Sequence, residues 1–544
     1  MNQTLRRFTA SGLALCFALS LTALPAQAEN AAAPATAVSA VDENTAGAEA
    51  APVSGDNTET LPPEGSDTDP EAPTEDPGEE PDTPATDPGS IPATWTSAHV
   101  RYLGGYEDRT VRPERQVTRA EAAAIVYRLL DTPEAGTGTC SYADVNDSDW
   151  FAINVRALCR LGLFDDGTAF RPNDPITRAE MVDLLVRLAP ETDSRTSFSD
   201  VPADYWAAEQ IGIAASLGWV GGYEDGTFRP ENGLTRAEAC SIINRVTARY
   251  GDAAQAQKLM GLGLYTDINE SHWAALTIAE ASIAHEHSGT GAAETWSAVD
   301  LASYTFTPGV HDIAGTLYSV DRYGKLALNK TVGAYWADAN GALTQTASSY
   351  QQSYVPYISQ IDGIYAWVGC EPVSALMGLK TFGYAQDVHV TTFLANLPFS
   401  SSNPEWGFVG SPYVVDNSLR TTIYPAALAQ YCNSYCGGAE VCADFRGASV
   451  EELRQELLAG NMVVAYETLW WEQPRYRNYW IDGQLQSLVY NNHAILVYGY
   501  DPARGYLVSD PYNYYNRGQT YQYWENAATF DNIWNQRKVG MVMR

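Results

Sequence analysis

The chain has 544 residues, which is enough for two or three domains of ordinary size. Its 66 acidic and 33 basic residues give a formal net charge of −33, and this acidic balance argues against a nucleic acid as its partner.

The first residues have the pattern of an export signal. Arg6 and Arg7 precede an apolar run from Leu13 to Leu24, and the small-residue sequence AQA follows at Ala26–Ala28. This order predicts a signal peptide at residues 1–28. No later apolar run has the length needed to span a membrane, so we expect a secreted protein without a transmembrane span.

A strongly acidic segment follows the signal peptide. From Glu29 to Trp95 there are sixteen Asp and Glu and no Lys or Arg, in a stretch rich in Pro, Thr, Ala and Gly. Such a composition cannot bury enough apolar surface to offset the entropy lost on ordering. We therefore expect residues 29–92 to form a disordered linker that acts as a solvated spacer.

The middle of the chain repeats a pair of motifs three times. VTRAE at Val117–Glu121, ITRAE at Ile176–Glu180 and LTRAE at Leu234–Glu238 recur at intervals of 59 and 58 residues. In each copy, Thr followed three residues later by Glu is the signature of a capping box and predicts the start of a helix. The second motif also precedes a predicted helix each time, and its copies are YADVNDSDW (Tyr142–Trp150), FSDVPADYW (Phe198–Trp206) and YTDINESHW (Tyr265–Trp273).

Together these motifs closely resemble surface-layer homology (SLH) repeats over roughly residues 93–285. The resemblance implies a mainly α domain with pseudo-three-fold symmetry that binds secondary cell-wall polysaccharides, often pyruvylated, without a covalent bond. It also implies a location at the cell wall or S-layer surface of a Gram-positive-type bacterium. The candidate polymer-binding residues are equivalent positions of the three copies: Arg119, Arg178, Arg236, Asp144, Asp200, Asp267, Trp150, Trp206 and Trp273.

Each of the three arginines follows the capping Thr, at a helix N-terminus, where a guanidinium and backbone N–H groups can share a carboxylate. The alternative is that each arginine only pairs with a neighbouring Glu on a solvated helix face. Recurrence in three equivalent positions favours binding.

In each repeat unit the second motif forms the opening half and the TRAE motif forms the closing half. The series begins with a closing half, before any opening half, and ends with an opening half. Too little chain lies between Trp95 and Gly104 for a normal first half. We therefore expect the opening half at Tyr265–Ala281 to complete the unit that begins at Gly104.

Residues 286–349 have a different pattern. Asp321-x-x-Gly324 and Asp338-x-x-Gly341 each precede alternating residues, which predicts small β-hairpins. We expect this linker segment to be a spacer or a surface that packs on the next domain, with glycan binding as the alternative.

Residues 350–544 contain enough apolar and aromatic sequence for one α+β domain. The segment WVGCEPVSALMGL places Cys370 in the first turn of a predicted helix, with Pro372 at its first position and Val373, Leu376 and Leu379 facing a core. A helix N-terminus favours thiolate, so Cys370 is a candidate nucleophile, and a structural cysteine is the alternative. Further on we expect a helix at Ser449–Ala459 and strands at Met462–Trp470, His493–Asp501 and Gly505–Pro511.

The remaining catalytic roles have candidates in the same domain. His493 opens an apolar strand, and Asp510 closes the next strand after a turn around Pro502–Gly505. Antiparallel pairing of these strands would bring the carboxylate to the imidazole, which supplies nucleophile, base and orienting group. Gln360 is the candidate oxyanion donor.

These segments resemble papain-like cysteine peptidases related to the double-glycine leader peptidases of bacteriocin exporters, over about residues 350–540. They are most similar to secreted relatives without a transporter, in which Gly-Cys-Glu stands where the exporters usually have Cys-Gly-Pro. The resemblance implies Cys370 as nucleophile, His493 as base, Asp510 as orienting group and Gln360 as oxyanion donor.

Seven cysteines remain after loss of Cys16, an odd number, so at least one is free or pairs between chains. Cys432, Cys436 and Cys442 lie close together but fit no usual zinc spacing, and we expect one local disulfide among them. No motif implies a cofactor, and the acidic turns at Glu107–Asp108 and Asp165–Asp166 are explained either as calcium ligands or as solvated turns.

The leading hypothesis is therefore a wall-anchored cysteine peptidase that acts on a peptide or protein substrate. One alternative is an amidase or endopeptidase that cuts peptidoglycan stem peptides. Another is a catalytically inactive binding or structural protein of the cell surface.

Overall fold

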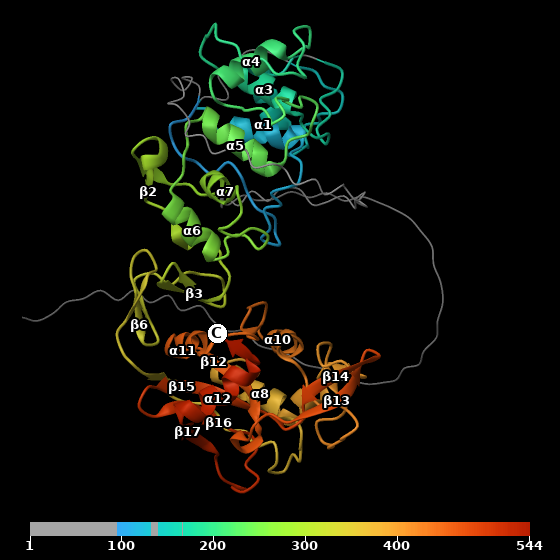
Figure 1. The fold of residues 1–544 in the computed structure, drawn as a ribbon, viewed down its shortest axis with the longest axis vertical. Coiled ribbons are helices and arrows are strands. Elements are labelled where there is room, and N and C mark those ends of the chain that lie inside the picture. The colour runs from blue at the N-terminus through green and yellow to red at the C-terminus, as the bar shows by residue number, and fades with distance from the viewer. Residues whose placement is uncertain (1–94, 132–139, 166) are drawn as a thin grey trace, which may run out of the picture. The chain divides into compact units, whose positions relative to one another are not determined.

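The computed structural model describes residues 95–131, 140–165 and 167–544 (Figure 1). The predicted signal peptide at residues 1–28 and the predicted linker at residues 29–92 lie outside the described residues. Among the residues described, no helix combines the length and the apolar character that crossing a bilayer requires.

The repeat region is helical. Its helices are α1 (Arg119–Arg128), α2 (Ala152–Arg160), α3 (Arg178–Val186), α4 (Ala208–Ser216), α5 (Arg236–Val246), α6 (Ala253–Gly261) and α7 (Ala275–Ser282). The three predicted capping boxes are confirmed at α1, α3 and α5. In α1, for example, the Thr118 hydroxyl accepts from the Glu121 N–H and the Glu121 carboxylate accepts from the Thr118 N–H at 2.9 Å. A cap of this kind stabilises a helix by about 1 kcal/mol.

A closed ring of backbone hydrogen bonds joins the three repeats just before these helices. Val117 donates to the carbonyl of Leu234 (2.8 Å), Leu234 donates to that of Ile176 (3.1 Å), and Ile176 donates to that of Val117 (2.9 Å). Figure 1 shows α1, α3 and α5 grouped together in this region. The ring confirms the mainly α, pseudo-three-fold class expected for these residues.

One aspartate in each repeat ties its two motifs together. Asp267 accepts from the N–H groups of Val111 (2.8 Å) and Arg112 (2.6 Å), and so joins the segment 265–281 to the unit that begins at Gly104. The equivalent contacts in the other units run from Phe170 and Arg171 to Asp144 and from Phe228 and Arg229 to Asp200.

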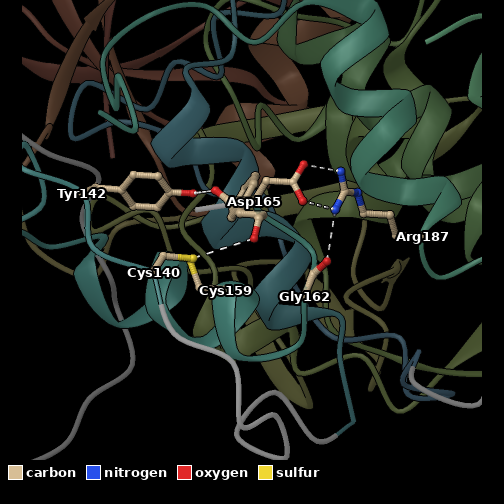
Figure 2. Close-up of a disulfide and its surroundings, with 7 residues drawn as sticks. Cys140, Tyr142, Cys159, Gly162, Asp165 and Arg187 are labelled. Atoms are coloured by element: carbon tan, nitrogen blue, oxygen red, sulfur yellow. Dashed lines mark hydrogen bonds and ion pairs between the residues drawn. A yellow bond between two sulfur atoms is a disulfide. The ribbon is translucent and has the colours of Figure 1, made fainter. Parts of the chain in front are cut away.

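The second repeat carries a disulfide between Cys140 and Cys159 at the end of α2 (Figure 2). Closing a loop of this size stabilises the fold by about 3 kcal/mol. Beside it, Arg187 makes two hydrogen bonds to the Asp165 carboxylate (2.7 and 2.9 Å), and the Tyr142 hydroxyl donates to the Asp165 carbonyl.

The other five described cysteines are free and buried: Cys240, Cys370, Cys432, Cys436 and Cys442. The expected local disulfide among the last three is therefore wrong. Cys436 instead donates to the carbonyl of Cys432 at 3.3 Å, a contact across one helical turn that leaves its sulfur bonded to backbone.

The segment after α7 consists of small antiparallel hairpins. Its strands are β1 (Glu286–Ser288), β2 (Thr295–Ser297), β3 (Gly309–Ile313), β4 (Thr316–Val320), β5 (Lys330–Val332), β6 (Tyr335–Ala337) and β7 (Leu343–Gln345), with 3-10 helices η1 (Gly291–Ala293) and η2 (Leu301–Ser303). The pairs are β1–β2, β3–β4 and β5–β6–β7. Asp338 caps the turn between β6 and β7, where Gly341 has φ of 84°. The segment packs on the last domain, because Ala334 donates to the carbonyl of Leu458 at 2.7 Å.

The last domain is built on one antiparallel sheet with strand order β11-β18-β12-β15-β16-β17, and β8 adds to β15. These strands are β8 (Tyr350–Gln351), β11 (Cys442–Asp444), β12 (Met462–Thr468), β15 (Asn492–Asp501), β16 (Gly505–Ser509), β17 (Gln522–Glu525) and β18 (Gly540–Met543). Smaller pairs are β9 (Phe399–Ser400) with β10 (Phe408–Val409), and β13 (Tyr476–Ile481) with β14 (Gln484–Val489).

Helices cover both faces of this sheet. They are α8 (Cys370–Thr381), α9 (Val390–Ala395), α10 (Pro425–Asn433), α11 (Val450–Leu458) and α12 (Ala527–Arg537), with the 3-10 helix η3 (Leu469–Trp471). Along β12, Val464 and Tyr466 join the core that contains α8, whereas Val463 and Ala465 join the core formed with α11 and α12. This layering confirms the α+β class expected for residues 350–544.

Candidate functional site

Cys370 is the first residue of α8 and is only 6% exposed. The helix therefore begins two residues before Pro372, which was expected at its first position. Pro372 is still in the first turn, where a missing N–H costs no intrahelical hydrogen bond. Val373, Leu376 and Leu379 are fully buried, as the helical spacing predicted.

His493 and Asp510 meet at one end of the sheet. His493 is the second residue of β15, and Asp510 directly follows β16, its antiparallel neighbour. The Nε2 atom of His493 lies 2.7 Å from Oδ1 of Asp510, and both residues are buried. Because a carboxylate only accepts, Nε2 carries the hydrogen and Nδ1 keeps its lone pair in the neutral ring. The pair therefore has the tautomer that a general base requires.

The Cys370 thiol has a different hydrogen-bond partner. Its Sγ donates to Oε2 of Glu371 at 3.3 Å, and within the described part of the chain it makes no hydrogen bond with His493. Burial and then the charge of Glu371 raise the pKa of the thiol well above its usual range, while the backbone N–H of Ala494 acts in the opposite direction. Cys370 is thus a neutral thiol in this arrangement. It lies beside Ala494, the residue that follows His493.

A short polar chain holds Glu371 in place. Its Oε1 accepts from the Thr422 hydroxyl and from Nδ2 of Asn492 (3.0 Å), and Arg537 donates to Oδ1 of Asn492 (2.6 Å). Asn492 directly precedes His493, so this chain links the residues beside the thiol and beside the imidazole. Sequence reasoning identified none of these partners.

Gln360, the candidate oxyanion donor, is also buried. Its side-chain Nε2 donates to the carbonyl of Ala366 (2.9 Å), and its backbone N–H donates to the carbonyl of Pro511 (2.9 Å). Its Oε1 has no hydrogen-bond partner among the described residues. These bonds place Gln360 between the loop before Cys370 and the residue after Asp510.

A cavity of about 280 Å³ adjoins His493 and Asp510. It is lined mainly by aromatic and acidic side chains: Glu467, Trp470, Trp471, Tyr512, Tyr515, Tyr521, Tyr523 and Glu525. Trp470 and Trp471 both have positive φ (55° and 59°), a strained backbone that is common at functional sites. Cys370 is not among the lining residues, so this cavity opens beside the base rather than beside the nucleophile.

Glu467 in this cavity was not singled out from the sequence. It is the cross-strand partner of His493 and is 1% exposed, and neither carboxyl oxygen has a hydrogen-bond partner among the described residues. Burial raises its pKa to about 8, although the charge of Arg537 acts in the opposite direction. The signal that could have revealed it is a lone charged residue within an otherwise apolar strand.

The three repeat arginines bind neighbouring units. Arg119 contacts Oε1 of Glu180 (2.6 Å) and the carbonyl of Phe170 (2.7 Å). Arg178 and Arg236 are buried and donate mainly to backbone carbonyls, those of Phe228 and Gly221 and those of Val111 and Gly104.

The repeat tryptophans, in contrast, face solvent. Trp150, Trp206 and Trp273 are 38%, 56% and 50% exposed. Trp206 borders a polar groove to which all three repeats contribute, and its other lining residues are Gln116, Arg171, Asp174, Pro175, Thr177, Glu180, Glu231 and Gly233. Of these groove residues, sequence reasoning had proposed only the tryptophan as a binding residue.

Comparison with known families assigns the two regions separately. Residues 101–123, 141–182 and 197–240 match the S-layer homology domain, and residues 352–541 match the Peptidase_C39 like family.

Known relatives match only part of the chain. The chain is 37% identical over 214 residues to cell surface glycoprotein 1 of Acetivibrio thermocellus, a match that covers 36% of this chain and 9% of that protein. It is 34% identical over 206 residues to the cellulosome-anchoring protein of the same organism, covering 35% of this chain and 44% of that protein. The chain thus spans less than half of these relatives.

A solved structure from Bacillus anthracis, described as a C39-like peptidase, is 23% identical with a TM-score of 0.30, and the likeness covers 36% of this chain and 98% of that one. The family matches establish that this chain combines SLH repeats, which indicate a cell-surface location, with a Peptidase_C39-like domain.

Proposed function

We propose that the protein is a cell-surface cysteine peptidase that its SLH repeats hold on cell-wall polysaccharide. The observation that carries the catalytic part is the hydrogen bond between His493 and Asp510, which gives the imidazole a defined tautomer close to a buried helix-terminal thiol. The proposed triad is Cys370, His493 and Asp510, with Gln360 as the oxyanion donor.

In the proposed reaction, Nδ1 of His493 takes the proton of Cys370 and the thiolate attacks the carbonyl carbon of a peptide bond. The amine leaves with the proton from His493, and water hydrolyses the thioester. Because Glu371 favours the neutral thiol, substrate binding has to bring the thiol and the imidazole together before proton transfer. The strained tryptophans and the cavity beside His493 are the candidate substrate contacts.

The full chain, incubated with a peptide library and followed by mass spectrometry, tests this proposal. Cys370→Ala and His493→Ala should abolish cleavage, and Asp510→Asn should lower the rate by about 10³-fold or more. Cys436→Ser, which changes another buried cysteine, is the matched control and should cleave normally. Cleavage that survives Cys370→Ala would contradict the proposed nucleophile.

The same incubation with muropeptides tests the alternative substrate. The match to SLH repeats is the observation that favours a stem-peptide substrate, because repeats of this family indicate a cell-surface location. Cleavage of muropeptides but not of library peptides would assign the domain to wall hydrolysis.

For wall binding, we propose that the exposed repeat tryptophans stack on sugar rings and that the groove beside Trp206 supplies polar contacts. The repeat aspartates then contribute to wall binding indirectly, because their carboxylates accept from backbone N–H groups and so position the loops of each unit; they are Asp144, Asp200 and Asp267. Trp206→Ala should weaken co-sedimentation of the chain with purified cell walls by about 10-fold, whereas Trp406→Ala, which changes an exposed tryptophan of the last domain, should not. Equal loss in both variants would contradict the assignment.

A further inference from the structure

Four buried side chains from separate segments converge beside α7. They are His99 in the segment before α1, Glu280 within α7, and His285 and Glu294 after it, with exposed fractions of 8%, 0%, 8% and 5%. One ligand atom from each lies within 4.8 Å of all the others. Two imidazoles and two carboxylates thus share one nearly dry location, outside both sites described above.

The spacing of these atoms fits a tetrahedral metal site. Nδ1 of His99 lies 3.0 Å from Oε1 of Glu280, 3.0 Å from Nε2 of His285 and 3.5 Å from Oε1 of Glu294. Nε2 of His285 lies 3.3 Å from Oε2 of Glu280. Four ligands placed tetrahedrally around an ion at about 2.0–2.1 Å are about 3.3 Å apart, so only small shifts would be needed.

Hydrogen bonds of neutral rings do not account for the contact between His285 and Glu280. Nδ1 of His285 lies 2.9 Å from the carbonyl oxygen of Ile283, which can only accept, so the hydrogen of the neutral ring is on Nδ1. Its Nε2 can then only accept, which it does from Nδ1–H of His99 at 3.0 Å, and Oε2 of Glu280 at 3.3 Å has no hydrogen-bond partner among the described residues. Two acceptors 3.3 Å apart favour either a metal ion or a second proton on His285 between them.

The surroundings orient these four groups as the outer partners of metal ligands do. The carbonyl of Ile283 fixes the tautomer of His285. The carboxylate of Glu294 accepts from the N–H groups of Tyr250 (3.1 Å) and Gly251 (3.2 Å), and Oε1 of Glu280 accepts from Nε of Arg249 (2.7 Å).

The charge of the cluster also favours a cation. With neutral imidazoles, two carboxylates and the single guanidinium of Arg249 leave one net negative charge in a buried location. An uncompensated buried charge costs several kcal/mol.

We propose that His99, Glu280, His285 and Glu294 bind one divalent transition-metal ion, and that this ion is zinc. Two nitrogen and two oxygen ligands suit zinc, whereas magnesium and calcium prefer sites made of oxygen alone. His287, whose ring stacks on that of His99 with centroids 3.7 Å apart, supplies no ligand atom.

The ion has a structural task at this place. The segment around His99 comes before the first repeat helix, whereas the other three ligands lie on and after the last helix of the repeat region. The backbone N–H of His285 also donates to the carbonyl of His99 (3.1 Å). Zinc therefore links the first and last segments of the repeat region, which are far apart in the sequence.

The experiment uses the full chain, stripped with a chelator, dialysed and then loaded with zinc. We expect one zinc per chain by mass spectrometry of the metal, and a higher melting temperature of the repeat region with zinc than without it. His285→Gln and His99→Gln should each weaken zinc binding by about 100-fold or more. His272→Gln, which changes a histidine of the same region that pairs with Glu114, should bind zinc normally.

Cobalt(II) provides a second readout that does not depend on folding of the variants. The wild-type chain should develop the visible bands of tetrahedral cobalt without the near-ultraviolet band of a cobalt–thiolate bond. A thiolate band would instead place the ion at a cysteine, and full zinc content in His285→Gln would place it elsewhere. Absence of bound zinc in the wild type would show that a second proton on His285 neutralises the cluster, and each of these three results overturns the proposal.

Discussion

Glu280 in the repeat region and Glu467 in the last domain are both fully buried, yet they are held in opposite protonation states. Burial alone would raise the pKa of Glu280, but the close imidazoles of His285 and His99 and the charge of Arg249 outweigh it and lower the pKa. Burial raises the pKa of Glu467 to about 8, and Arg537 offsets only part of this.

The difference lies in the side chains that contact each carboxyl group directly, and a guanidinium is among them only for Glu280. Arg249 donates directly to the carboxylate of Glu280 at 2.7 Å. Arg537 donates to the backbone carbonyl of Glu467 and to Asn492, so the Glu467 carboxyl group receives its charge only at a distance. For these two groups, direct contacts with two imidazoles and a guanidinium lower the carboxyl pKa, whereas a guanidinium at a distance does not outweigh burial.

Removal of Arg249 should have the largest effect, because it tests directly whether a cation stabilises the buried carboxylate of Glu280. Arg249→Met should lower the free energy of unfolding of the repeat region by about 3–5 kcal/mol, because it leaves the Glu280 carboxylate buried without its cation. Pulse proteolysis of the full chain in urea with a chelator present, with repeat-region fragments identified by mass, measures this change.

The double variant Arg249→Met with Glu280→Gln is the matched control. It should recover much of the lost stability, because a neutral amide needs no cation. A loss below about 1 kcal/mol in the single variant would show that the ion pair does not stabilise this region.

The second prediction concerns the protonated state of Glu467. Between the unfolded pKa of about 4.3 and the folded pKa of about 8, the folded state binds a proton that the unfolded state has released. This group's contribution to stability is therefore complete below about pH 4.3 and is lost as the pH rises towards 8, by about 1.4 kcal/mol for each pH unit.

Glu467→Gln should remove that slope, because glutamine does not titrate. Pulse proteolysis at pH 5, 6, 7 and 8, with fragments of the last domain followed, compares the variant with the wild type. Parallel curves for the two proteins would show that Glu467 is ionised in the folded state, as Glu280 is.

Local sequence signals were sufficient for the parts of the fold that depend on neighbouring residues. The Thr-x-x-Glu spacing predicted the capped starts of α1, α3 and α5, because a capping box is complete within four residues. The apolar run after His493 and the turn before Gly505 predicted β15 and β16, and their antiparallel register carries His493 towards Asp510.

The remaining features depend on partners far apart in the chain. His99 and His285 are 186 residues apart, and no local spacing connects them. The hydrogen bond between Cys370 and Glu371 joins adjacent residues, but its effect on the thiol depends on burial and on Thr422 and Asn492. Sequence position suggested a thiol activated by a helix N-terminus. In the fold, burial and the charge of Glu371 instead oppose ionisation of the Cys370 thiol.

The smallest expected effect concerns the thiol of Cys370. It extends the comparison of Glu280 with Glu467 to a third buried ionisable group. Glu371→Gln should lower the pKa of Cys370, because the amide removes a negative charge beside the sulfur and its N–H can donate to the thiolate. Burial still acts on the thiol, so we expect about a 10-fold faster alkylation at pH 8, equivalent to about one pKa unit. Peptide mapping after timed iodoacetamide labelling of the full chain measures the rate at Cys370 alone.

Glu451→Gln, on the exposed face of α11, is the matched control and should leave the rate unchanged. If Glu371→Gln labels no faster than the control, burial alone keeps the thiol neutral. Cys370 would then resemble Glu467, whose protonation burial decides, and activation would require solvent or substrate to reach the thiol. A faster rate would instead identify Glu371 as the group that holds the nucleophile in its protonated state until substrate brings the thiol to His493.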